Sequence, residues 1–139
     1  MDRLNKVNNF ISGIKNGFLT FKKINNQPLF ILYTILIWSC YLFMTVVCFY
    51  CFTETEDLNL AEGLFVMVAG GLGMIVPTPT GIGSYHYLVI KSLLALGISN
   101  SVAGFLAIVV HTSQAIMIII SGMFAMIILY VNQFRNNHE

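Results

Sequence analysis

The chain has 139 residues, of which 57% are hydrophobic and only 9% are charged, and its formal net charge is +1. A soluble domain carries about 25% charged residues, so this composition excludes an ordinary soluble protein and predicts an integral membrane protein. The small net charge, without a long basic run, also excludes a nucleic-acid partner, because binding phosphates requires a basic face.

Residues 1–27 predict an amphipathic helix at the cytoplasmic membrane interface. Apolar residues recur at every third or fourth position, and four lysines lie off this stripe. Five basic residues in the same stretch favour a helix lying on an anionic surface, with a coiled coil as the alternative. The stripe consists of Leu4, Val7, Ile11, Ile14, Phe18 and Phe21, and the lysines are Lys6, Lys15, Lys22 and Lys23.

Residues 28–52 predict a transmembrane helix. They include no Asp, Glu, Lys or Arg, and about 20 apolar residues suffice to cross a bilayer. Basic residues precede this span and an acidic loop follows it, so the positive-inside bias predicts a cytoplasmic N-terminus and an external loop. We interpret Cys40, Cys48 and Cys51 as thiols in apolar surroundings rather than as a redox or zinc site.

Residues 63–96 predict two half-length helices joined by a break. The 14 residues of 63–76 give about 21 Å of helix, which is short of the roughly 30 Å hydrocarbon core. The sequence Val-Pro-Thr-Pro-Thr-Gly-Ile-Gly-Ser at 76–84 then interrupts the helix, because proline removes amide donors and glycine permits unusual backbone angles. The helical pattern resumes over 84–96. These features favour a re-entrant helical hairpin, with a kinked full span followed by a short one as the alternative.

Residues 101–131 predict a second, tilted transmembrane helix of about 46 Å, followed by a cytoplasmic tail at 132–139. A polar band interrupts this span, for which two interpretations are open: packing inside the bundle, or a pathway for a substrate. The band consists of His111, Thr112, Ser113 and Gln114. The predicted fold class is therefore an all-α integral membrane protein, a helical bundle that contains a re-entrant hairpin.

The break carries the candidate binding site. If a half-helix begins at Ser84 in mid-membrane, its free amides and positive dipole end favour an anionic phosphate, while carbonyls near Val76 suit an ammonium group. Lys91, two turns beyond Ser84, is expected either to attract the phosphate or to extend to the interface. No catalytic residue, metal ligand or cofactor is predicted. The candidate substrate-binding residues are Pro77, Pro79, Gly81, Gly83, Ser84, His86, Lys91, His111 and Gln114.

The stretch from Pro77 to Gly83, followed by His86, Gly97-Ile98 and a long helix with a polar residue at 111, resembles a known family. It is similar to the C-terminal half of the lysylphosphatidylglycerol synthase transmembrane region, also called the flippase-like domain, over roughly residues 10–126. The family pattern has glycine where this chain has Thr80, Glu at the position of His86 and Arg at the position of His111.

The resemblance implies a multi-pass protein of the bacterial inner or cytoplasmic membrane, and the charge bias predicts that both termini are cytoplasmic. Some family members carry an aminoacyl-transferase domain outside the membrane, but nothing in this sequence could form one, so no enzyme is predicted. The resemblance also implies binding or translocation of a phospholipid or lipid-linked head group. Family members are about twice as long, which implies a homo-oligomer or a partner chain that supplies the missing half. The alternatives are a transporter of a small polar solute, or a non-transporting assembly subunit or fragment of a longer membrane protein.

The two histidines at the family's charged positions lead to one further expectation. Two charged imidazoles close together in a low-dielectric bundle would be costly, so both are expected to be neutral at neutral pH. Acidification should charge at least one of them and change activity between about pH 5 and 7. Spacing along the sequence does not show whether His86 and His111 meet.

Overall fold

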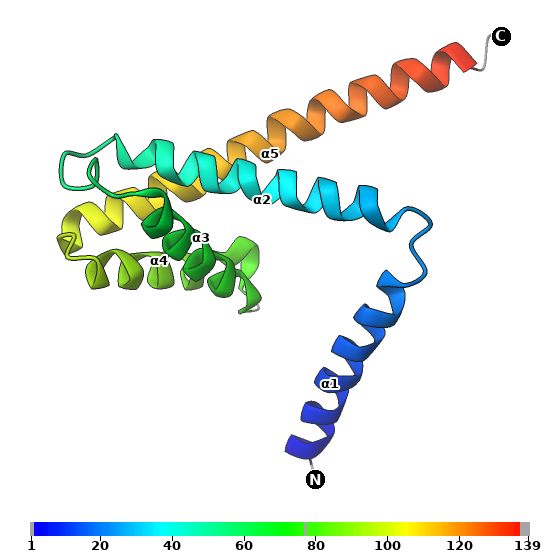
Figure 1. Ribbon diagram of the computed structural model, residues 1–139, viewed down its shortest axis with the longest axis horizontal. Helices are drawn as coiled ribbons and strands as arrows, with labels where there is room; N and C mark the ends of the chain where they lie inside the picture. Colours follow the sequence, from blue (N-terminus) through cyan, green and yellow to red (C-terminus); the bar gives the residue numbers. More distant parts are fainter. Residues whose placement is uncertain (1, 77, 137–139) are drawn as a thin grey trace. The chain divides into compact units, whose positions relative to one another are not determined.

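The computed structural model describes residues 2–76 and 78–136, and this part of the chain contains helices but no strand. The all-α class is therefore confirmed. The chain divides into two compact units, Met1–Ser39 and Cys40–Glu139, and the boundary between them lies inside the second helix. The elements in chain order are α1 Asp2–Phe21, α2 Gln27–Phe49, α3 Leu60–Ile75, the short 3-10 helix η1 Pro79–Gly81, α4 Ser84–Ala95 and α5 Asn100–Asn136 (Figure 1).

The first unit contains α1, a tight turn and the beginning of α2. The side-chain oxygen of Asn26 accepts a hydrogen bond from the amide of Leu29 at 3.3 Å, which caps the N-terminus of α2, and Pro28 suits the first turn. The rings of Phe21 and Phe30 meet edge to face across the turn, with centroids 5.8 Å apart. The helix predicted over residues 1–27 thus ends earlier, at Phe21, because Asn26 and Pro28 start a new one.

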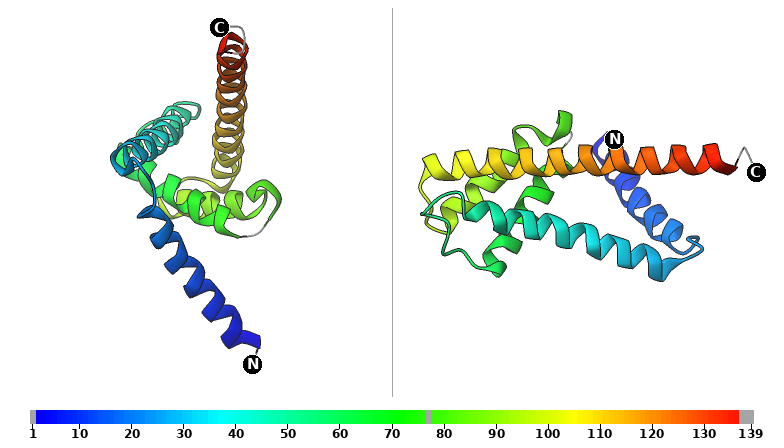
Figure 2. Two further views of the ribbon diagram at one scale, coloured as in Figure 1. Left: turned by 90° about the vertical axis from the view of Figure 1, so that its right-hand side faces the viewer. Right: turned by 90° about the horizontal axis from the view of Figure 1, so that it is seen from above.

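Within the described residues, two helices, α2 and α5, are long and apolar enough to cross a membrane, by length and composition. Their most apolar windows have mean hydropathies of 2.1 and 2.3. α5 has 37 residues, or about 55 Å of helix, and it continues past Val131 to Asn136. Every residue from Ile118 to Arg135 is exposed, as expected for a helix whose apolar surface faces lipid. Figure 2 shows α5 as one continuous helix.

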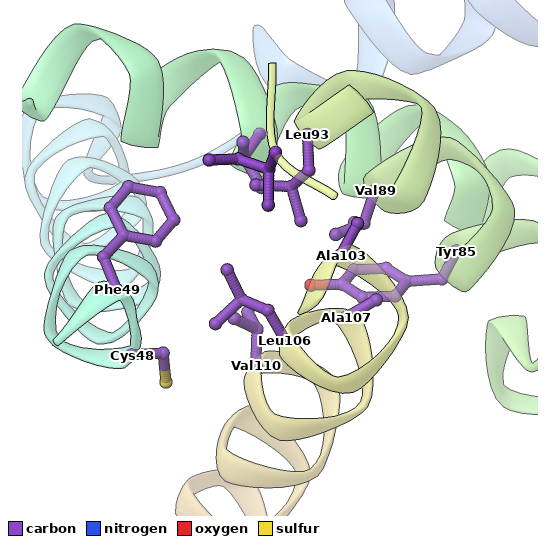
Figure 3. Close-up of a cluster of buried hydrophobic side chains, with 11 residues drawn as sticks. Cys48, Phe49, Tyr85, Val89, Leu93, Ala103, Leu106, Ala107 and Val110 are labelled. Atoms are coloured by element: carbon purple, nitrogen blue, oxygen red, sulfur yellow. The ribbon is translucent and has the colours of Figure 1, made fainter. Parts of the chain in front are cut away.

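A single buried cluster holds the second unit together. It joins the end of α2, the pair α3 and α4, and the first half of α5. Ala103 and Ala107 are fully buried, because small side chains let α5 approach its neighbours closely. The cluster consists of Cys48, Phe49, Val66, Tyr85, Val89, Leu93, Ile98, Ala103, Leu106, Ala107 and Val110 (Figure 3).

α3 and α4 pack against each other as a helical hairpin of two half-length arms. Their 16 and 12 residues give about 24 Å and 18 Å of helix, both shorter than the hydrocarbon core. Glycines allow the close approach: a Cβ on Gly70 would lie 2.5 Å from the ring of Tyr85, and one on Gly73 would lie 2.7 Å from the Cα of Tyr85. On another face of α3, a Cβ on Gly63 would lie 2.7 Å from Val46 of α2.

The end of the hairpin away from the break, which we call the base, is fixed by polar contacts. α3 begins with a capping box in which Asn59 and Glu62 satisfy each other's backbone amides. α4 ends at a left-handed turn at Gly97, with φ 87°. The carboxylate of Glu54 accepts a hydrogen bond from the amide of Ser99 at 3.1 Å, which ties the loop before α3 to the loop after α4.

Candidate functional site

The tip of the hairpin, residues 76–84, follows directly from its prolines and glycines. Pro79 starts the single turn of η1, where its fixed φ is suitable. Gly81 and Gly83 have φ values of 71° and 92°, a region that side chains disfavour, and they reverse the chain into α4. Pro77, also a predicted site residue, lies outside the described residues.

Hydroxyl groups close the tip onto α4. The Oγ1 of Thr78 and the Oγ of Ser84 lie 2.9 Å apart, and the Ser84 hydroxyl donates to the carbonyl of Gly81 at 3.3 Å. The N-cap of α4 is Gly83, so no side chain caps the amides of the first turn. The amide of Thr78 donates to the carbonyl of Val76 at 2.7 Å, which uses one of the two lone pairs of that oxygen at the end of α3.

Three aromatic side chains, Tyr85, His86 and His111, meet just beyond the tip, and we call them the ring cluster. The imidazoles of His86, in the first turn of α4, and His111, within α5, have centroids 5.0 Å apart. The Tyr85 ring lies 4.6 Å from His111 and 5.8 Å from His86. Both imidazoles are half-buried and Tyr85 is buried. Two predicted site residues from separate helices thus lie side by side.

Tyr85 belongs to this geometry although nothing in the sequence singles it out. Its ring fills the space that a side chain on Gly70 would need, and its backbone packs against Gly73. It extends from α4 toward α5 near Ala103 and Ala107, with its hydroxyl pointing into the buried cluster (Figure 3). In the sequence, Gly70 and Gly73 on α3 predict that another helix approaches closely, but they do not show which side chain fills the space.

Lys91 and Gln114 are two further predicted site residues. Lys91 lies on a different face of α4 from His86, whereas Gln114 lies near His111 on α5. Lys91 is exposed, and its Nζ lies 5.6 Å from the centroid of the Tyr87 ring, a cation–π arrangement. Five positions separate Lys91 from His86, a rotation of about 140° around the helix, so the two are on different faces of α4. Gln114 is half-buried one turn beyond His111, where α5 leaves the core.

The ring cluster lies in a region of the sequence without carboxylates. No Asp or Glu occurs between Glu62 and Glu139, and Lys91 is the only Lys or Arg between Glu62 and Arg135. Glu62 is in the first turn of α3, at the opposite end of that helix from Gly73. Among the described residues, no group of three or more His, Cys, Asp or Glu side chains is arranged to hold a metal ion. The arrangement offers imidazoles, hydroxyls and a helix N-terminus to a ligand.

Comparison with known proteins assigns the chain to a family. None of the curated proteins and none of the solved structures matches it. A family model described as the lysylphosphatidylglycerol synthase TM region matches residues 2–122, which is most of the chain. That family is a membrane domain of flippase-like proteins, in agreement with the two long apolar helices. The resemblance inferred from the tip and from positions 86 and 111 is therefore confirmed, and the chain belongs to the lysylphosphatidylglycerol synthase TM region family.

Proposed function

We propose that the hairpin is re-entrant, and that its tip and the ring cluster bind the phosphate-bearing head group of a lipid and move it between leaflets. The observation that supports this most is the meeting of two imidazoles beside the first turn of α4, just after the irregular tip that joins two half-length apolar helices. In hydrocarbon, irregular backbone persists only where protein covers it or where it lines a polar cavity.

The chemistry at the tip suits a phosphate. The first turn of α4 presents amides without a side-chain cap, and its positive dipole end favours an anion. The imidazoles of His86 and His111 add N–H donors for phosphate oxygens. In this arrangement the acyl chains stay in the bilayer beside the exposed apolar surface of α5, so only the head group enters the cavity.

The membrane topology in this proposal follows from the positive-inside bias of the charged residues. α1 lies on the cytoplasmic surface, α2 crosses outward, the hairpin enters and returns on the outer side, and α5 crosses back, which leaves both termini in the cytoplasm. The protein is then a multi-pass, non-enzymatic component of the cell membrane. In this proposal a second copy or a partner chain completes the polar cavity.

Leaflet exchange of a labelled lipid tests the proposed function. The purified protein is reconstituted into vesicles that contain a head-group-labelled phosphatidylglycerol, and the label is quenched from outside by a membrane-impermeant reagent. We expect the inner-leaflet label to become accessible faster than in protein-free vesicles. Equal rates would contradict translocation. Release of a trapped polar solute without lipid exchange would instead support a solute transporter.

Water access to the tip is a separate expectation. In a background without the native cysteines, Thr78→Cys should react with a small charged thiol reagent in vesicles, because a polar cavity admits water to mid-membrane. Ile127→Cys, on the exposed apolar surface of α5, is the matched control and should stay inert. Asn59→Cys at the base should react fully. Inertness of Thr78→Cys together with labelling at Asn59 would argue against a water-lined tip.

A further inference from the structure

We propose that the ring cluster takes up its anionic ligand together with a proton, so that the His86–His111 pair selects head groups of net negative charge. The inference rests on the proposed function of the same site. It involves no covalent change in the ligand. A proton from water joins one imidazole nitrogen, and the negative charge of the phosphate neutralises the imidazolium that forms.

The geometry of the pair supplies the proton site. Imidazole is the side chain whose charge ordinarily changes near neutral pH. With centroids 5.0 Å apart in partly buried positions, two imidazolium rings would repel each other strongly, so the first proton is accepted more readily than the second. The geometry of the pair therefore provides a site for a single added proton.

Among the described residues of the second unit, no carboxylate is placed to balance that charge. The acidic residues of the loop before α3 belong to the base, at the other end of the hairpin, and so does Glu62. A positive charge without a partner in an apolar bundle is costly. The remaining titratable or charged groups on the packed elements of the second unit are Cys40, Tyr41 and Cys48 on α2, Tyr85, Tyr87 and Lys91 on α4, and Tyr130 and Arg135 on α5.

The compensating negative charge must therefore come from the ligand. By linkage, protonation of the pair raises the affinity for an anion, and the bound anion raises the affinity for the proton by the same factor. A zwitterionic head group brings its own ammonium group and neutralises the imidazolium less completely. Head groups with net negative charge are thus preferred, and the preference grows as the pH falls.

Lipid binding to the full-length protein in detergent tests this inference. The probes are phosphatidylglycerol, which is anionic, and phosphatidylcholine, which is zwitterionic, each titrated at about pH 5.5 and about pH 7.5. We expect phosphatidylglycerol to bind about fivefold or more tightly at the lower pH, and phosphatidylcholine to change little. His86→Gln and His111→Gln should each reduce the pH dependence, and the double variant should abolish it. His138→Gln, which changes the third histidine of the chain, should retain it.

A variant with a permanent positive charge at position 111 gives a sharper test than the glutamine variants. His111→Arg should bind phosphatidylglycerol tightly at both pH values, because its guanidinium stays protonated without an added proton. Unchanged pH dependence in a folded double variant, or in His111→Arg if the double variant does not fold, would overturn the inference. Equal affinity of the parent protein at both pH values would overturn it too, while lipid exchange above the protein-free rate would still uphold the proposed function. Tight binding at low pH without any lipid exchange would contradict translocation alone.

Discussion

Gly73→Ala should lower the free energy of unfolding by an amount near the upper end of the ~1–3 kcal/mol that overpacking a core costs. A Cβ at this position would lie 2.7 Å from the Cα of Tyr85 and 2.8 Å from the carbonyl oxygen of Ser84. Both atoms belong to the backbone of α4, so no side chain can rotate away and the two arms of the hairpin must separate. Thermal unfolding of the purified variant in detergent measures the effect.

The matched control for that prediction is Gly104→Ala. Gly104 lies within α5, and a Cβ there would meet nothing within 4 Å. Replacing glycine by alanine inside a helix favours the helix by up to about 1 kcal/mol, so this variant should be at least as stable as the parent. Equal unfolding temperatures for the two variants would show that the approach of α3 to α4 is not as close as described.

Gly81→Val should disable lipid exchange while leaving membrane insertion intact. Its φ of 71° is unfavourable for a β-branched residue, at a cost of about 1–3 kcal/mol, and its Cβ would meet the side chain of Met74. Gly83→Val should act in the same way through φ alone, because a Cβ there meets nothing within 4 Å. Exchange rates are normalised to the protein recovered in the vesicles.

Ile82→Val is the control within the same tip. Ile82 lies between the two glycines with φ −59° and ψ 128°, a conformation that valine adopts readily, and its side chain is exposed. Its exchange rate should equal that of the parent. If Gly81→Val matched Ile82→Val, the backbone of the tip would play no part in transport. Failure of both glycine variants to insert would assign the glycines a purely structural role.

The order of helices is readable from the sequence because its signals are local. Charge-free runs locate α2 and α5, and the prolines and glycines of the tip separate α3 from α4. Helix ends are less accurate. α1 stops early because Asn26 caps a new helix, and α5 continues to Asn136 because neither glycine nor proline occurs after Val131 to stop it.

The site is less predictable because it depends on how separate helices dock. His86 and His111 are identifiable by residue type, but 25 positions separate them, and they meet only because α5 packs closely on α4 through small residues such as Ala107. Lys91 is on the face of Ser84, whereas His86 is about 200° away from Ser84 around the helix. Tyr85 is inconspicuous because an aromatic residue in an apolar helix is usually a packing residue.

The link between Glu54 and Ser99 has a mechanical consequence. A directional hydrogen bond ties the loops at the base of the hairpin, whereas near the ring cluster the two arms meet through an aromatic ring and glycines. Because a shear of α4 along α3 would displace both ends of α4 together, the link at the base resists the motion that would part His86 from His111.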